Sequence, residues 1–176
     1  MKFSKLSIDG AYRIDLDRLE DQRGYFSRSF CKNEFEAHNL DIMIVQCNIS
    51  YNKRKGTIRG MHFQDKPYEE LKIVSCIKGE VYDVILDIRP GSSTYGKWDA
   101  VILDDQAYSS VYIPRGCAHG FQTLRDDCVV YYQMGETYHE EYSRGVRWND
   151  EKFSIEWPIK TLIISDKDSQ YPDYFS

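Results

Sequence analysis

Apolar residues recur at every second position through the middle of the chain, in short runs separated by turn residues. A period of two is typical of β-strands, whereas a helix repeats every 3.6 residues. The pattern predicts strands at 72–77, 81–88, 100–103, 110–113 and 129–133. Only 32–39 and a turn at 166–169 resemble helices. Without alternating strands and helices, a parallel α/β sheet is disfavoured, and a sandwich or jelly-roll barrel is predicted.

The predicted strand 81–88 has two faces of different character. One face carries Val81, Asp83, Ile85 and Asp87, and the other carries Tyr82, Val84, Leu86 and Ile88. Since the second face is entirely apolar, we expect it to point toward the core.

The length predicts a single domain, and the composition excludes a disordered chain. The 176 residues fit one domain, 1–176, and no repeat or linker divides them before a tail from about Trp157. Hydrophobic residues make up 41% and charged residues 29%, which is enough apolar material for a globular core.

The net charge and the lack of targeting patterns in the sequence argue against several classes of function. The net charge is -5 with no block of like charges, which argues against general binding of nucleic acid or membrane surfaces. No signal-peptide pattern or membrane-length apolar run is present, so a cytoplasmic protein is expected. The five cysteines include no C-x-x-C pair, which predicts reduced thiols rather than a disulfide framework or zinc ribbon.

Two motifs carry the candidate chemistry. Gly56 is followed by His62-Phe-Gln64, and later Pro114-x-Gly-x-x-His119 appears. This layout resembles the two strand motifs of metal-binding cupins, which supply His and Glu side chains to one ion. Gln64 stands where the second His of the first motif is found, and an amide is a poor ligand for a transition metal. We therefore expect a cupin frame with no bound metal.

The polar side chains of these motifs favour an anionic ligand. On a strand, His62 and Gln64 point the same way, and Lys72 is expected on the next strand over. With Arg23, Arg59 and His119 they would form a cationic, hydrogen-bonding cluster in an acidic protein. Such a cluster suits an anion with a carbonyl group nearby.

Over residues 20–170 the chain resembles the dTDP-4-dehydrorhamnose 3,5-epimerases, which are cupins that act on nucleotide-linked 4-keto sugars. Matching stretches include 21–26, 46–50, 58–64, 113–121 and 148–150, and the strings at 59–64 and 113–121 are the specific ones. The resemblance implies an all-β, cupin-type double-stranded β-helix (jelly roll) with short flanking helices. It also implies a cofactor-independent epimerase that inverts C3, C5 or both, and a homodimer in which N-terminal strands pair across subunits.

The resemblance assigns four catalytic roles. His62 matches the base that removes the proton beside the ketone, and Asp168 matches the carboxylate that orients its imidazole. Lys72 matches the cation beside the C4 oxygen, where negative charge develops, and Tyr132 matches the proton donor. The dyad requires the tail to fold back and place Asp168 beside His62.

The resemblance also assigns the substrate contacts. Diphosphate and sugar contacts are Arg23, Arg59, Lys72, His119 and Lys167, polar contacts are Gln46 and Asn48, and aromatic walls for the base are Phe26 and Tyr138. Guanidinium groups suit phosphate, and aromatic faces accept any base by stacking.

Two departures from the family leave the substrate open. Arg28 and Ser143 stand where the family has Glu, at the nucleotide end of the pocket. Because a site built for one hydrogen-bond pattern rejects another, dTDP is the default nucleotide, with CDP and GDP as competitors. Epimerisation at a single carbon, a 4-keto sugar isomerase and a silent nucleotide-sugar-binding cupin are alternatives, and a metal-dependent oxygenase is the least favoured.

Overall fold

The computed structural model describes residues 1–160 and 163–174, and within them the chain is built mainly from β-strands. The first sheet contains, in spatial order, β1 (Lys2–Lys5), β2 (Tyr12–Asp15), β10 (Ser110–Ile113), β7 (Lys72–Lys78), β12 (Cys128–Met134) and β5 (Gln46–Asn52). The second contains β13 (Ser143–Gly145), β6 (Ile58–Gln64), β11 (Cys117–Thr123), β8 (Glu80–Asp87) and β9 (Trp98–Asp104). The remaining elements are the hairpin β3 (Arg18–Asp21) and β4 (Gly24–Ser27), α1 (Lys32–Ala37), η1 (Glu140–Tyr142) and α2 (Asp166–Ser169).

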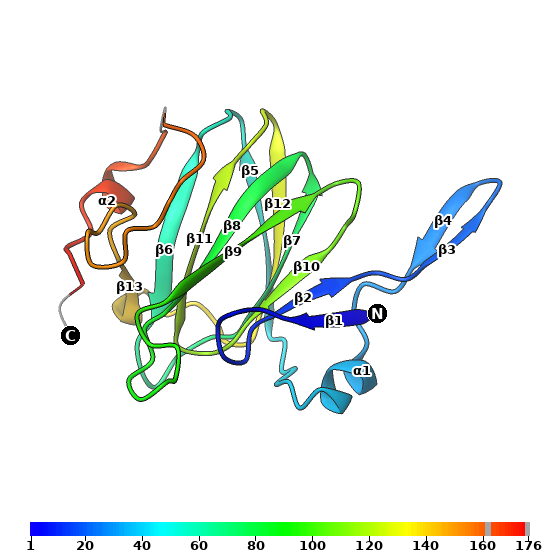
Figure 1. The fold of residues 1–176 in the computed structure, drawn as a ribbon, viewed down its shortest axis with the longest axis horizontal. Helices are drawn as coiled ribbons and strands as arrows, with labels where there is room; N and C mark the ends of the chain where they lie inside the picture. The colour runs from blue at the N-terminus through cyan, green and yellow to red at the C-terminus, as the bar shows by residue number, and fades with distance from the viewer. Residues whose placement is uncertain (161–162, 175–176) are drawn as a thin grey trace.

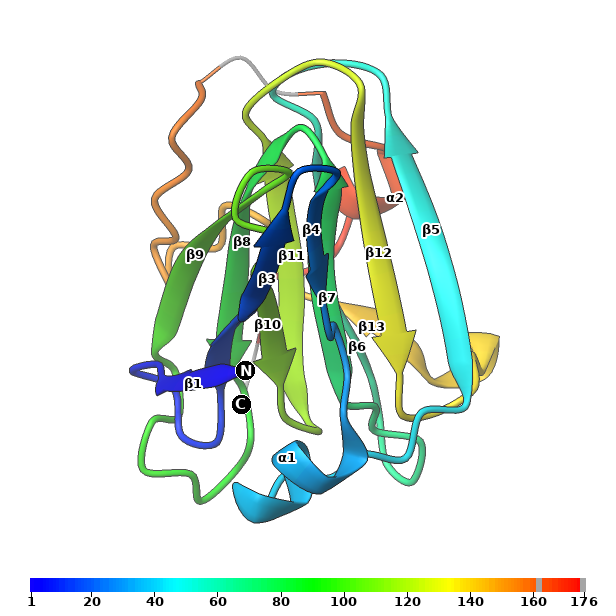
Figure 2. The same cartoon turned by 90° about the vertical axis from the view of Figure 1, so that its right-hand side faces the viewer.

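The two large sheets face each other across the core (Figures 1 and 2), and their paired strands are antiparallel. From β5 to β8 successive strands change sheet, since β6 lies in the second sheet, β7 in the first and β8 in the second, and β9 to β12 alternate in the same way. This arrangement confirms the predicted all-β jelly roll with short flanking helices. β10 has the predicted bounds, and β7, β8, β9 and β12 agree with their predictions to within two residues.

The main core lies between the sheets. It contains buried apolar side chains from both: Val74, Cys76, Val81, Ile85, Val111, Ile113, Phe121 and Val130. Burying each of the larger side chains contributes about 1.5–3 kcal/mol, so this layer supplies most of the force that holds the sheets together.

The predicted orientation of β8 is wrong. Val81 and Ile85 belong to the core between the sheets, and Asp83 shares their face. The all-apolar face, with Val84 and Leu86, packs on the outside against the C-terminal part of the chain. Both faces are covered, so an apolar face alone does not identify the inner side of this strand.

The C-terminal segment forms that outer cover. Val146, Phe153 and Ile155 pack against the second sheet, with Trp157 and Tyr174 at the margin. The indole Nε1 of Trp157 donates a hydrogen bond to the Trp148 carbonyl oxygen at 2.8 Å, which fixes the start of the predicted tail. The segment thereby runs back across the sheet that contains β6.

The helix predicted at 32–39 is shorter in the structure. α1 ends at Ala37 because Asn39 adopts a left-handed conformation, with φ of 57°. In the described chain its N-cap, Cys31, makes no side-chain capping bond. α1 is held instead by Phe35, which is buried against Ile14 and Tyr112 of the first sheet.

The β3–β4 hairpin extends away from both sheets as an arm (Figure 1). Leu19 and Phe26 are paired across it, and each is 70% exposed. An isolated two-stranded hairpin is marginally stable in water. The arm therefore presents apolar side chains that the rest of this chain leaves uncovered.

A bulge in β6 sets the direction of its side chains. His62 pairs with His119 and Arg59 pairs with Phe121, so Gly60 and Met61 together lie opposite Gly120. Paired residues point to the same face, so this extra residue turns both Arg59 and His62 inward despite their odd spacing. Gly60 has a φ of 141°, and a Cβ there would lie 2.5 Å from the Gly120 Cα.

Substitution of Gly60 tests this close approach. Gly60→Ala should lower the free energy of unfolding by about 3 kcal/mol or more, because the backbone strain and the overlap with Gly120 add. Gly91→Ala is the matched control, since Gly91 also has a positive φ but a Cβ there would meet nothing within 4 Å. Urea unfolding that shows equal losses for both variants would refute the packing argument.

Candidate active site

A cavity of about 530 Å³ opens between the sheets, lined by β5, β6, β7, β11 and β12 together with the C-terminal segment. It contains most of the predicted site residues: Gln46, Asn48, Arg59, His62, Gln64, Lys72, His119, Tyr132, Tyr138, Ser143 and Lys167. Residues distant in sequence thus meet in one cavity of the size that small-molecule ligands occupy.

The predicted dyad is present in the structure. His62 Nε2 lies 2.8 Å from Asp168 Oδ1. Because an ionised carboxylate only accepts hydrogen bonds, Nε2 carries the proton and Nδ1 of a neutral His62 is left as the basic nitrogen. The folded-back C-terminal segment therefore places Asp168 where the dyad requires it.

Asp168 is buried and hydrogen-bonded from several sides. Its Oδ2 accepts from the Gly60 backbone N–H at 3.2 Å, and its own N–H donates to Ser165 Oγ at 3.1 Å. Burial acts to raise the pKa of Asp168, but the hydrogen bonds from His62, Gly60 and Ser165 outweigh it and hold the pKa below its usual value. Asp168 is therefore a carboxylate at neutral pH.

Lys72 reaches the cavity from the opposite sheet, not from the strand beside His62 as the sequence suggested. Its Nζ forms a 2.6 Å ion pair with Glu70 Oε1 and donates to the His62 carbonyl oxygen at 3.3 Å. Glu70 Oε2 also accepts from the Gln64 backbone N–H at 3.2 Å. Both side chains of the pair are at least 94% buried, so the ammonium is fixed in position.

Tyr132 faces the cavity from β12, in the sheet opposite His62. Its ring meets the His119 ring edge-on at 6.2 Å between centroids. His119 Nε2 lies 2.9 Å from Asp83 Oδ2 in the buried interior. Burial and then the Asp83 carboxylate raise the pKa of Tyr132, so its phenol keeps its proton at neutral pH.

Among the residues that the structure describes, two cations at the cavity have no carboxylate partner. Arg59 Nε donates to the neutral amide of Asn52 at 2.7 Å, and Lys167 lines the cavity from α2. Among residues 1–160 and 163–174, neither forms an ion pair. These two positive charges suit an anionic ligand.

The side chain of Gln64 is hydrogen-bonded to the backbone of the segments around the cavity. Its side-chain amide donates to the carbonyl oxygens of Tyr68 at 2.9 Å and Thr137 at 3.1 Å, and accepts from the His139 N–H at 2.6 Å. It therefore joins the loop after β6 to the segment after β12. Gln46 acts similarly, since its Oε1 accepts from the Tyr138 N–H at 3.2 Å.

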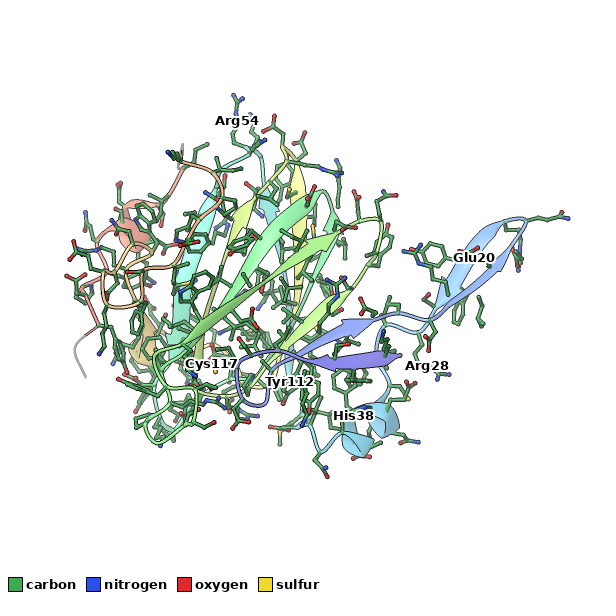
Figure 3. All side chains as sticks on the ribbon, viewed as in Figure 1. Glu20, Arg28, His38, Arg54, Tyr112 and Cys117 are labelled. Carbon is green, nitrogen blue, oxygen red and sulfur yellow. The ribbon has the colours of Figure 1, made fainter. Side chains whose placement is uncertain are left out.

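Arg23, Phe26 and Arg28 do not reach the cavity of their own chain in the described structure. Arg23 and Phe26 lie on the exposed hairpin arm, where Arg23 pairs with Asp21 at 2.5 Å. Arg28 lies at the base of the arm, near β1 and α1, and pairs with Glu34 at 3.2 Å (Figure 3). One chain therefore does not bring all of the predicted site residues to the same cavity.

The sequence analysis also made predictions about the cysteines, metal binding and membrane-spanning segments. The five cysteines are free thiols in the described residues. Within the same residues, no group of three His, Cys, Asp or Glu side chains is placed to hold a metal ion. Across the described chain, helices of membrane-spanning length and apolarity are lacking.

Sequence reasoning missed three residues at the site: Glu70, Asp83 and Tyr171. Asp83 had a visible signal, because it interrupts an apolar strand, and a buried carboxylate needs a partner. Glu70 and Tyr171 lie outside any regular pattern, and only the fold shows that they face the cavity.

The fold and cavity define a cupin in which His62, paired with Asp168 of α2, faces the partly buried Tyr132 on the opposite sheet. Comparison with other proteins gives the family. A profile of the dTDP-4-dehydrorhamnose 3,5-epimerases matches residues 5–175. The enzyme of that name from Methanothermobacter thermautotrophicus is 42% identical over 174 residues, covering 97% of this chain and 92% of the relative.

Solved structures give the same result. The dTDP-4-dehydrorhamnose 3,5-epimerase from Elizabethkingia anophelis superposes with a TM-score of 0.96 at 36% identity, covering 99% of this chain and 96% of the other. The Bacillus anthracis enzyme, solved with TDP and PPi bound, gives 0.95 at 36%, covering 98% and 99%. The chain belongs to the dTDP-4-dehydrorhamnose 3,5-epimerase family and is an epimerase of the isomerase class.

The lowered pKa of Asp168 predicts a pH-dependent contribution to stability. The ionised form stabilises the fold above the unfolded-state pKa of about 3.9, and this contribution is lost as pH falls through the lower folded-state value. Asp168→Asn should therefore be about 1–3 kcal/mol less stable than wild type at pH 7, with the difference shrinking below about pH 4. Urea unfolding across this range measures it.

Asp166→Asn serves as the control, since Asp166 is exposed on the same helix. A difference between wild type and Asp168→Asn that stays constant down to pH 2.5, about one unit below the usual Asp pKa, would contradict the ionised, hydrogen-bonded state of Asp168.

Proposed function

We propose that this protein inverts C3 and C5 of a dTDP-linked 4-keto-6-deoxy sugar without a cofactor. One observation carries the proposal: His62 and Tyr132 face the same cavity from opposite sheets. Inversion at a carbon needs a base on one side and an acid on the other, and this arrangement supplies both.

The first step is removal of a proton beside the ketone. Nδ1 of His62 accepts it, and the buried Asp168 carboxylate stabilises the imidazolium that forms. The ketone acidifies its neighbouring carbons, so the electrons move onto the C4 oxygen. Lys72, held by Glu70, is the cation proposed to meet that oxygen.

The second step returns a proton from the opposite face. Tyr132 keeps its proton at neutral pH and lies on the sheet that also carries Lys72. Val74 pairs with Tyr132 and Met134 pairs with Lys72, so Tyr132 and Lys72 point to the same side of that sheet. A sugar ring between the sheets would thus have the base on one face and the donor on the other.

The nucleotide assignment draws on the charges of the site and on the relatives. Arg59 and Lys167 are proposed to bind the diphosphate, and Tyr138, 57% exposed at the cavity, to stack on the base. A Legionella pneumophila relative was solved with dTDP-4-keto-L-rhamnose. Since the resemblance places Arg28 and Ser143 where the family has Glu, titration with dTDP, CDP and GDP decides the base.

A homodimer is proposed to complete the site. The arm presents Leu19 and Phe26, and the outer face of the first sheet presents Ile49 at 67% and Ile77 at 40% exposure. Pairing these apolar surfaces would bury them and bring Arg23, Phe26 and Arg28 to the partner's cavity. The cytoplasmic location stays a prediction from the sequence.

Epimerisation at one carbon is the second candidate. A relative from Streptomyces niveus, 36% identical, is a dTDP-4-dehydrorhamnose 3-epimerase. A small change in sugar pose alters which proton meets the base, so the NMR spectrum of the product separates the two activities.

Isotope exchange tests the catalytic proposal. In deuterated water the wild type should introduce deuterium at C3 and C5 of the 4-keto nucleotide sugar. His62→Ala should lower this exchange by at least about 10²-fold, because it removes the general base.

His38→Ala is the control, since His38 lies beside α1 (Figure 3), is not part of the cavity lining and stacks on Phe3. Absence of exchange by the wild type with dTDP-, CDP- and GDP-linked substrates would overturn the proposed activity. Unchanged exchange in His62→Ala would overturn the role of His62.

The assembly is tested separately. Analytical ultracentrifugation should give a mass near twice the 20.7 kDa of the chain. Ile77→Glu should shift the protein toward monomer and reduce turnover, because a charge would be buried at the proposed interface. Ile102→Glu, on the exposed side of β9, should do neither, and a monomeric wild type would contradict the dimer.

A further inference from the structure

Tyr171, in the C-terminal segment beyond α2, lies against the catalytic dyad. Its ring meets the His62 ring edge-on, with 5.9 Å between centroids and 71° between planes. Gly145 pairs with His62 across β13 and β6, and a Cβ at Gly145 would overlap the Tyr171 ring. The missing side chain at Gly145 is therefore the space that the Tyr171 ring occupies.

The segment around Tyr171 is tied down on both sides. Before it, Ser165 caps α2, and Asp168 is bonded to His62. After it, Asp173 pairs with Arg147, and the Tyr174 N–H donates to Asp150 Oδ2 at 2.6 Å. With anchors at both ends, the ring of Tyr171 is held in a defined position in the cavity lining.

The hydroxyl of Tyr171 is buried without a partner. Its oxygen is shielded from solvent, and within residues 1–160 and 163–174 no group forms a hydrogen bond with it. An unpaired buried hydroxyl costs free energy, so such a group in a binding cavity points to a ligand that pairs with it. Burial and the nearby Asp168 and Tyr138 raise the pKa of Tyr171, so the phenol retains its proton as a donor.

The position of Tyr171 indicates which part of the ligand its side chain contacts. The ring adjoins His62, where the sugar must react, while the nucleotide is assigned to Tyr138, Arg59 and Lys167. Accordingly we propose that Tyr171 is a substrate-binding residue whose hydroxyl donates a hydrogen bond to a hydroxyl oxygen of the bound sugar. This inference rests on the proposed function and adds a sugar contact to it.

Removal of the single oxygen atom tests the contact. Calorimetric titration first identifies which of dTDP, CDP and GDP the wild type binds most tightly. The affinity for that free nucleotide is then compared with the affinity for the same nucleotide linked to glucose, a sugar ester of the diphosphate. The ester carries the sugar but no ketone, so it binds without reacting. Tyr171→Phe should weaken binding of the ester about fivefold and leave binding of the free nucleotide unchanged.

Tyr174→Phe is the matched control. Tyr174 lies in the same segment, but its hydroxyl donates to the Ile88 carbonyl oxygen at 3.4 Å on the outer face of the sheet. This variant should bind both ligands as wild type does. An equal loss of ester binding in both variants would show a general effect of the segment and overturn the specific contact.

A second variant tests the same contact by displacing the Tyr171 ring without changing the tyrosine itself. Gly145→Ala should displace the ring and weaken binding of the ester at least as much as Tyr171→Phe. In Tyr171→Ala the space is empty, so adding Gly145→Ala should cause no further loss. Additive losses would contradict the proposed packing of Tyr171 on Gly145.

The outcomes separate the two proposals. Equal binding of the ester by wild type and Tyr171→Phe overturns the sugar contact while leaving the epimerase proposal intact. A loss of affinity for the free nucleotide in Tyr171→Phe also overturns it, because the hydroxyl would then face the nucleotide. Failure of wild type to bind any of the three nucleotides overturns the proposed function together with this inference.

Discussion

The hydrogen bond between Asp168 and His62 links the two parts of the molecule on which the site depends. It joins the C-terminal segment to β6, and the second oxygen of Asp168 is bonded to the Gly60 N–H in the bulge of that strand. The bulge in turn directs both Arg59 and His62 inward. The same contact therefore fixes the orientation of His62, the proposed base, the position of its proton and the covering segment that carries Lys167 and Tyr171.

Buried acids also hold two other polar side chains of the cavity. Glu70 fixes Lys72 and Asp83 fixes His119, as Asp168 fixes His62. Side chains held in this way lose little freedom when substrate binds, which is the condition for efficient proton transfer. Arg59 and Lys167 lie outside these pairs, which explains how a chain of net charge -5 offers positive charge to a diphosphate.

The sequence was sufficient for β7, β8, β9, β10 and β12, because buried strands alternate strongly, and the two motifs located β6 and β11, but β1, β2, β5 and β13 were not predicted. It misassigned the faces of β8, since the cover on its outer side comes from residues 146–174. It also placed Lys72 beside His62 in one sheet, because strand order in a jelly roll does not follow chain order. Glu70 and Tyr171 face the cavity through loop and tail geometry, which has no period to detect.

Separating proton exchange from inversion tests the central claim, that base and acid act from opposite sheets. In Tyr132→Phe, His62 should still remove and return a proton on its own face. NMR in deuterated water should therefore show deuterium entering the sugar at C3 or C5 while its configuration is retained. Inversion at the wild-type rate in this variant would contradict the account.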